Sequence, residues 1–184
     1  MADDIEMVTE LRKHTSSIFR VDANAGWTLE QALQKIPLLK ELGVELVEQP
    51  LAKEDWEGMK ILYEKSTLPL IADESCVTEA DVEKCQNHFH GINIKLTKCS
   101  GITPARRMIT KAKELGMKVM VGCMNESSVG TAAIAQLAPM LDYVDMDGTL
   151  LLAADTAEGV KFDFGKILFN DMPGLGLKVQ SLIN

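Results

Sequence analysis

Short apolar runs recur along the chain, and each of them ends in polar residues. The first run, Ser16–Val21, is followed by Asp22. Later runs end in the same way at intervals of about 22 to 28 residues, which is the spacing of an internal structural repeat. Because the runs are short and nearly continuous in apolar side chains, they predict β-strands that are buried on both faces. The polar residues that follow the later runs are Glu48, Asp73, Lys95, Cys123 and Asp145.

Helical patterns lie between the apolar runs. Thr28 and Gln31 have the spacing of a capping box, in which the hydroxyl accepts a backbone N–H and the glutamine side chain reaches back. Apolar residues follow at steps of three and four over Leu29–Leu39, and Gly43 is placed to end that helix. Further helices are predicted in the first dozen residues, at Asp55–Lys65, at Thr78–Cys85, around Pro104 and ending at Gly116, and at Ser128–Leu137.

The predicted order of elements is a helix, five strand–helix units and a sixth strand. This alternation favours a parallel sheet with right-handed crossovers, either a β/α barrel or a doubly wound sheet. No glycine-rich dinucleotide or phosphate-binding motif follows a strand, which argues against a nucleotide-binding sheet. A complete (β/α)₈ barrel needs eight strands and about 250 residues. We therefore predict an α/β fold, an incomplete β/α barrel with about six of the eight strands, formed by residues 1–150 and followed by a tail, residues 151–184.

Composition and charge narrow the classes of function. The 184 residues are 46% hydrophobic and 25% charged, which is ordinary for a soluble globular domain with a core. The net charge of −8 argues against nucleic acids and anionic membranes as partners, because both select basic patches. No apolar run approaches the roughly 20 residues that cross a bilayer. The acidic start MADDIEMV lacks the order of a signal peptide.

Cysteine and histidine spacing gives little sign of a metal or redox site. The four cysteines lie far apart without a C-x-x-C pair, which favours reduced thiols and a cytoplasmic location. His88 and His90 flank Phe89 in an expected loop. An H-x-H pair can bind a metal ion, but we favour solvated loop histidines.

Carboxylates follow the first three predicted strands, at Asp22, Glu48 and Asp73. In a β/α barrel the carboxyl ends of all strands lie at one face, where active sites form. Three carboxylates in a partly dry pocket would repel one another, and a divalent cation removes that cost. Because the ligands are all oxygens, Mg²⁺ is the expected ion. The alternative is that each acid only caps the helix that follows it.

Lys95 ends the next predicted strand and lies between apolar neighbours. Its ammonium group would lie near the metal in a partly desolvated mouth. We expect this environment to lower the pKa of Lys95, so that the neutral amine can act as a base. The alternative is a structural ion pair between Lys95 and one of the carboxylates.

Asp145 and Asp147 lie two residues apart near the last predicted strand, so both side chains would share one face. Paired acids of this kind can bind an ammonium group or a second metal ion. The alternative is that Gly148 simply closes a turn there. The residues alone leave these interpretations open.

Five motifs occur in a fixed order along most of the chain: VDANAGW, VEQP, IADES, NIKLTKCSGIT and VGCMNESSVG. Together they resemble the barrel of the enolase superfamily, in its muconate-lactonising branch. The DMDG segment that follows resembles the D-x-D signature of the dipeptide epimerases within that branch. Five motifs in this order make the resemblance far more specific than any one of them alone.

This resemblance implies an isomerase that removes the α-proton of a dipeptide by way of an enediolate, with Mg²⁺ stabilising the charge. Other reactions of the branch, muconate cycloisomerisation and o-succinylbenzoate synthesis, use substrates without an ammonium group, which paired acids would repel. A second lysine is expected on the opposite face of the α-carbon. The site residues that the resemblance implies are Asp22, Glu48 and Asp73 for Mg²⁺, Lys95 for proton transfer, and Asp145, Asp147 and Cys123 for the substrate.

The chain departs from the family pattern before Asp22. The family carries its second lysine in a K-x-K motif on barrel strand two, and no such motif precedes Asp22. The cap domain of the family is not matched, and residues 151–184 resemble the segment that returns toward it. We therefore expect an incomplete barrel with open sheet edges, which invite pairing with a second copy or with a complementing chain. A catalytically silent half-barrel that serves as an assembly module is the alternative function.

Overall fold

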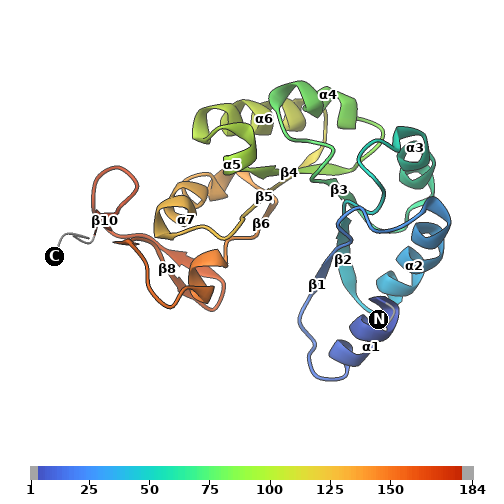
Figure 1. The fold of residues 1–184 in the computed structure, drawn as a ribbon, viewed down its shortest axis with the longest axis horizontal. Helices are drawn as coiled ribbons and strands as arrows, with labels where there is room; N and C mark the ends of the chain where they lie inside the picture. Colours follow the sequence, from blue (N-terminus) through green and yellow to red (C-terminus); the bar gives the residue numbers. More distant parts are fainter. Residues whose placement is uncertain (1–3, 180–184) are drawn as a thin grey trace.

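The computed structural model describes residues 4–179. Its centre is a sheet of six parallel strands in the order β1-β2-β3-β4-β5-β6, curled into part of a barrel (Figure 1). The curl spans 239° and leaves an open side between β1 and β6. This architecture confirms the predicted incomplete β/α barrel. The strands are β1 (Phe19–Asp22), β2 (Val44–Glu48), β3 (Leu70–Ala72), β4 (Gly91–Lys95), β5 (Lys118–Gly122) and β6 (Tyr143–Val144).

Helices cover the outer face of this sheet (Figure 1). They lie where the sequence predicted helices, with one addition, the four-residue α5 directly after β4. Within residues 4–179 no helix combines the length and the apolar character needed to cross a membrane. The helices are α1 (Asp4–Arg12), α2 (Leu29–Glu41), α3 (Trp56–Lys65), α4 (Val82–Cys85), α5 (Leu96–Cys99), α6 (Ile102–Glu114) and α7 (Ser128–Ala135), with 3-10 turns at Glu79–Asp81, Ala138–Met140 and Gly148–Leu151.

The predicted capping box sets the start of α2. Thr28 Oγ1 accepts a hydrogen bond from the backbone N–H of Gln31 at 3.2 Å, and Gln31 Oε1 accepts one from the N–H of Thr28 at 2.9 Å. After the other end of α2, Gly43 has a φ of 77°, a left-handed conformation that favours glycine. The chain therefore leaves α2 and enters β2 within a very short turn.

The main core lies between the sheet and the helices. Ile36 and Leu39 of α2 and Leu62 of α3 are almost completely buried there. Apolar strand residues that face outward pack against these helices, as expected for a parallel sheet covered on its outer face. A second, smaller cluster fills the inside of the curl below the strand ends. Its members are Leu46, Ile71 and Met120, with Tyr143 packed against them.

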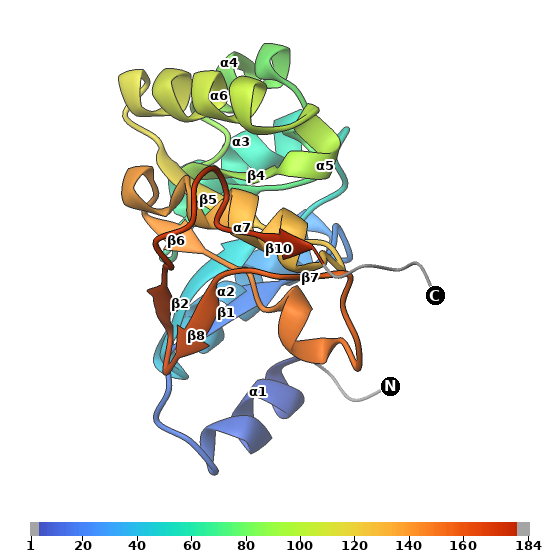
Figure 2. The same cartoon turned by 90° about the vertical axis from the view of Figure 1, so that its left-hand side faces the viewer.

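The tail beyond the barrel forms two small antiparallel pairs of strands, which the sequence analysis did not predict. β7 (Ala157–Glu158) pairs with β10 (Lys178–Val179), and β8 (Lys161–Asp163) pairs with β9 (Lys166–Leu168). β7 contacts α7, and Figure 2 shows the tail strands gathered on one side of the molecule. Phe164, in the turn between β8 and β9, is fully exposed.

Candidate active site

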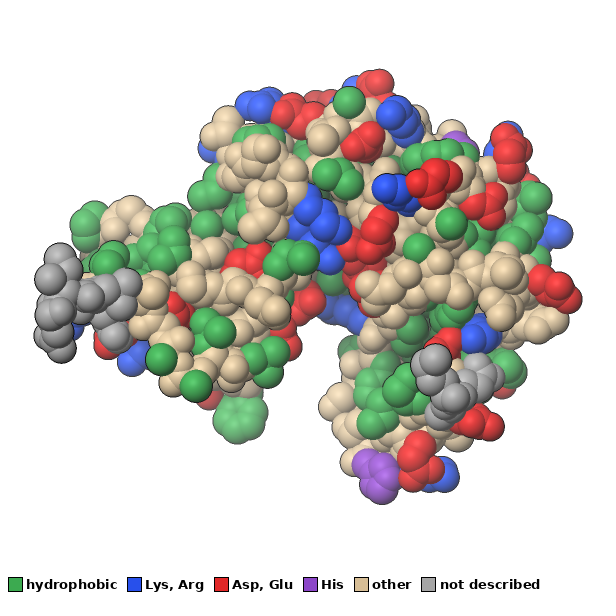
Figure 3. All heavy atoms as spheres, in the orientation of Figure 1, with side chains coloured by type: hydrophobic (Ala, Val, Ile, Leu, Met, Phe, Trp, Pro, Cys, Tyr) green, Lys and Arg blue, Asp and Glu red, His purple; other side chains and the backbone are tan. Residues whose placement is uncertain are grey.

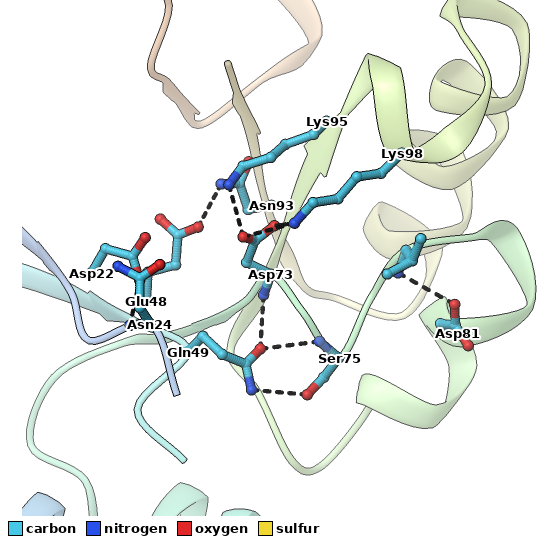
Figure 4. A network of polar contacts seen from close by, with 11 residues as sticks. Asp22, Asn24, Glu48, Gln49, Asp73, Ser75, Asp81, Asn93, Lys95 and Lys98 are labelled. Atoms are coloured by element: carbon cyan, nitrogen blue, oxygen red, sulfur yellow. Dashed lines mark hydrogen bonds and ion pairs between the residues drawn. The ribbon is translucent and has the colours of Figure 1, made fainter. Parts of the chain in front are cut away.

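The carboxyl ends of the strands bring four of the predicted site residues together. Asp22 and Glu48 are the last residues of β1 and β2 and lie opposite each other in the register of these strands. Asp73 directly follows β3, and Lys95 is the last residue of β4. Figure 4 shows these four side chains pointing toward one another, and Figure 3 shows acidic and basic side chains gathered in the hollow of the curl.

Glu48 is buried among polar groups. Only 6% of it is exposed, and burial raises its pKa to about 7. Asn93 opposes this rise because its Nδ2 donates a hydrogen bond to Glu48 Oε1 at 2.7 Å, whereas the charges of Asp22 and Asp73 increase it. Gly122 leaves room for Asn93, since a Cβ atom at residue 122 would lie 2.7 Å from Asn93 Nδ2.

Asp73 pairs with two lysines at once. Its side chain is 2% exposed, and its Oδ2 accepts a hydrogen bond from Lys95 Nζ at 2.7 Å. Lys98 Nζ donates to Oδ1 at 2.8 Å and to Oδ2 at 3.0 Å. The sequence analysis did not single out Lys98. Spacing was the available signal, because a residue three positions after Lys95 on the short helix α5 returns to the same side.

The expectation of a lowered pKa for Lys95 is wrong for this structure. Burial does pull its pKa down, but the hydrogen bond to Asp73 and the charges of Asp73, Glu48 and Asp22 outweigh burial. The pKa of Lys95 therefore lies above its usual value. The ion pair that we considered as the alternative role is present, and Lys95 is also positioned on the cavity described below.

Other residues cap the helices that follow the first two acids. Thr28 caps α2 and Asp55 caps α3, so neither Asp22 nor Glu48 has the capping role considered as the alternative. Asp22 instead accepts a hydrogen bond from the backbone N–H of Asn24 at 2.8 Å. Burial raises the pKa of Asp22 despite this hydrogen bond.

The three carboxylates at these strand ends have the chemistry that suits a hard divalent cation. Among the described residues, however, their ligand atoms do not all lie within 4.8 Å of one another, as those of Cys123, Asp145 and Asp147 do. Burial is the main reason that the pKa values of Asp22 and Glu48 are raised, and the negative charges of the neighbouring acids add to the rise. Lys95 and Lys98 pair with Asp73 and balance only part of this charge. A cation that prefers carboxylate oxygens, such as Mg²⁺, would offset the remainder.

Cys123, Asp145 and Asp147 form a second group at the ends of β5 and β6. One ligand atom from each residue lies within 4.8 Å of the other two. The thiol of Cys123 donates a hydrogen bond to Asp147 Oδ1 at 3.7 Å. Both aspartates are exposed. Partial burial of the Asp145 carboxylate nevertheless raises its pKa, and the charge of Asp147 adds to that rise. The surroundings of Asp145 therefore favour a cationic ligand.

One cavity of about 660 Å³ joins the two groups. Asp73 lies too deep to line it. Arg20, which the sequence analysis did not consider, crosses the curl here: its Nη1 donates to the carbonyl of Val144 at 3.4 Å, and its Nε pairs with Glu45 at 2.8 Å. The predicted site residues that line the cavity are Asp22, Glu48, Lys95, Cys123, Asp145 and Asp147. A small molecule in it can therefore meet a carboxylate cluster, an amine and a pair of acids at the same time.

His88 and His90 make separate structural contacts. The ring of His88 packs edge-on against Trp56, and its Nδ1 lies 3.0 Å from the carbonyl of Gln86. His90 Nδ1 accepts a hydrogen bond from the backbone N–H of Leu70 at 3.1 Å. Burial lowers the pKa of His90, so His90 is a structural residue of the sheet and not the solvated loop residue that we favoured.

Comparison with known proteins extends this description. The family model described as "Enolase C-terminal domain-like" matches residues 1–182. An L-Ala-D/L-amino acid epimerase from Maribacter sp. is 58% identical over 179 residues, which cover 97% of this chain and 53% of that protein. The chain therefore spans about half the length of this relative.

Two solved structures share the fold. A substrate-liganded L-Ala-D/L-Glu epimerase from Bacillus subtilis matches with a TM-score of 0.89 and 34% identity, over 95% of this chain and 51% of that one. A dipeptide epimerase from Cytophaga hutchinsonii, complexed with Mg and the dipeptide D-Ala-L-Val, matches with a TM-score of 0.91 and 30% identity, over 98% of this chain and 51% of that one.

Proposed function

The chain belongs to the enolase C-terminal domain-like family, and on that premise we propose that it is the barrel portion of a Mg²⁺-dependent dipeptide epimerase. Such an enzyme is an isomerase that inverts the α-carbon of one residue of a dipeptide. The observation that carries the proposal is that Asp22, Glu48, Lys95, Asp145 and Asp147 all line the same cavity. Epimerases of dipeptides among its relatives support the proposal.

In this proposal Asp22, Glu48 and Asp73 hold the metal ion. When bound, Mg²⁺ would offset the negative charge that develops on the substrate carboxylate as the α-proton leaves. The chain's own contribution is to fix the three acids. Asn93 orients Glu48, and Lys98 keeps Asp73 in place while Lys95 moves a proton.

Lys95 is the proposed acid/base residue on one face of the α-carbon. Among the described residues it is the single lysine in the cavity lining. Inversion needs a second group on the opposite face, and the open side between β1 and β6 is where two more strands would close the barrel. We propose that these strands, supplied by a longer form of the protein, a second copy or a complementing chain, carry the second lysine.

Asp145 and Asp147 would bind the α-ammonium group of the dipeptide, with Cys123 beside them. Their charges select a cationic group, which favours a dipeptide over the substrates of cycloisomerases or o-succinylbenzoate synthases. We further propose that residues 1–150 form the catalytic barrel and that the tail, residues 151–184, contacts a cap domain. Exposed apolar side chains in the tail, such as Phe164 and Phe169, are consistent with such a contact. A cytoplasmic location is part of the same proposal.

Hydrogen–deuterium exchange at the α-carbon tests this function. The purified chain with Mg²⁺ and a set of dipeptides in D₂O should incorporate one α-deuterium without inversion, because Lys95 serves one face alone. Lys95→Ala should abolish exchange, whereas Lys84→Ala, which removes an exposed lysine paired with Asp81, should not. Absence of exchange with every dipeptide would contradict the proposal and favour the silent assembly module. Exchange that survives in Lys95→Ala would show that another group is the base.

A further inference from the structure

Gln49 follows Glu48 directly and has an unusual conformation. It is completely buried, with 0% exposure. Its φ is 34°, in the left-handed region that side-chain-bearing residues seldom adopt. Such a conformation persists when surrounding contacts hold it, and it recurs at functional sites. The contacts of Gln49 therefore show what holds it and what it holds.

The side chain of Gln49 joins the ends of β2 and β3. Its Oε1 accepts hydrogen bonds from the backbone N–H groups of Asp73 at 3.0 Å and Ser75 at 3.1 Å. Its Nε2 donates to the carbonyl of Leu51 and to Ser75 Oγ, both at 2.9 Å. Figure 4 shows Gln49 bridging to Asp73 and Ser75 beneath the carboxylate cluster.

The backbone of Gln49 reaches the other two strand ends. Its N–H donates to the carbonyl of Ile71 in β3 at 2.9 Å, and its carbonyl accepts from the N–H of Ala25 at 2.7 Å, in the loop that follows Asp22. Gln49 is itself covalently linked to Glu48. One uncharged residue is thus bonded to all three segments that carry the carboxylates.

We propose that Gln49 is a positioning residue for the metal centre, which sets the distances among Asp22, Glu48 and Asp73 without touching the ion. This role rests on the proposed function. Outer residues that orient metal ligands typically contribute 10- to 100-fold to metal affinity. Because Gln49 carries no charge, its replacement changes the geometry of the ligands and leaves the net charge of the site unaltered.

The experiment measures Mn²⁺ binding to the chain by electron paramagnetic resonance, which reports free Mn²⁺ and needs no catalysis. Asp22→Asn, which keeps the ion pairs of Asp73, identifies the signal of this site. Gln49→Met should weaken Mn²⁺ binding by roughly 10- to 100-fold. A buried variant in α2, Ile36→Val or Leu39→Ala, chosen to give the same drop in melting temperature, should bind Mn²⁺ as the unmodified chain does. A lower melting temperature without weaker binding would mean a merely structural role.

Ser75→Ala keeps the test decisive if Gln49→Met does not fold. It removes the Oγ atom that Gln49 Nε2 contacts and should weaken Mn²⁺ binding by a smaller factor. If Gln49→Met folds and binds Mn²⁺ as tightly as the unmodified chain does, the role of Gln49 is overturned and the proposed function stays intact. If Gln49→Met does not fold, the same result with Ser75→Ala has the same meaning. Failure of the unmodified chain to bind Mn²⁺ would instead refute the metal centre and the role together.

Discussion

The two sides of the cavity are built differently. On the side of the carboxylate cluster, Glu48 and Asp73 are 6% and 1% exposed, and Asn93, Gln49 and the lysines surround them with hydrogen bonds. On the side of Asp145 and Asp147 the acids reach solvent, and the bond from Cys123 is long.

This difference suits the two tasks that we propose. A metal centre needs fixed ligands, so burial and hydrogen bonds hold its acids in one arrangement. A substrate subsite must exchange its ligand with water at every turnover, so exposure is acceptable there. It follows that changes on the buried side should affect both stability and chemistry, and changes on the exposed side should affect substrate binding alone.

Asp73→Asn should have the largest effect on the buried side of the cavity, on both stability and activity. It removes the carboxylate with which both Lys95 and Lys98 pair, and removing one member of a buried ion pair costs about 3 kcal/mol or more of the free energy of unfolding. Deuterium exchange should fall below detection. Denaturant unfolding and the D₂O assay measure the two effects. Glu83→Gln, which removes the exposed partner of Lys111, should change neither, and exchange by Asp73→Asn would contradict the assignment.

The pH dependence of the free energy of unfolding should reveal the titration of Glu48. Without Mg²⁺ the folded chain keeps a proton on Glu48 up to about pH 7, whereas the unfolded chain loses it near 4.5. The folded state therefore binds more protons between these values, and stability should fall by up to about 3 kcal/mol as the pH rises from about 4.5 to 7.

Glu48→Gln isolates this contribution from that of other groups. His90 acts in the opposite direction, because its lowered pKa makes the folded state more stable as the pH rises toward 6.5. The difference between the two stability curves removes His90, and Mg²⁺ at pH 8 should recover the stability of the unmodified chain. Parallel curves for the chain and Glu48→Gln would show that Glu48 does not titrate in this range.

Asp145→Asn and Asp147→Asn should act on binding alone. Losing a hydrogen bond to a charged group should raise the KM for dipeptides roughly 10- to 100-fold, while the melting temperature stays the same because both residues are exposed. Steady-state exchange kinetics measure this change. An N-acetylated dipeptide, which has no ammonium group, should bind the variants at least as tightly as it binds the unmodified chain, because the variants carry one repelling carboxylate fewer. A fall in kcat at constant KM would place these acids on the reacting atoms instead.

Cys123→Ser should have the smallest effect. The thiol is a weak donor, so replacing it with a hydroxyl should change the KM by less than about threefold. Its melting temperature should match that of the unmodified chain. A KM change larger than that of Asp147→Asn would indicate direct contact between Cys123 and the substrate.

The sequence predicted the parts of the site that depend on the repeat. Parallel strands bring their carboxyl ends to one face, so the positions of Asp22, Glu48, Asp73 and Lys95 at successive strand ends were enough to predict that they meet. The capping box at Thr28 was readable for a similar reason, because its partners are three residues apart.

Features that depend on distant contacts were not predicted. The pairing of Lys98 with Asp73 needs the fold of the short helix α5, and the raised pKa of Lys95 follows from that same carboxylate. The bonds of Gln49 require a left-handed backbone that its side chain alone would not favour. The tail strands are only two or three residues long, too short for an alternating pattern to appear.

The absence of a side chain at Gly122 has a consequence for how the pKa of Glu48 could be changed. The atoms nearest to a methyl group there belong to the amide of the buried Asn93 side chain, which would have to move away. Alanine at residue 122 would thus withdraw the donor that holds down the proton affinity of Glu48. One carbon atom on β5, outside the set of ligands, would change the pKa of a carboxyl group three strands away.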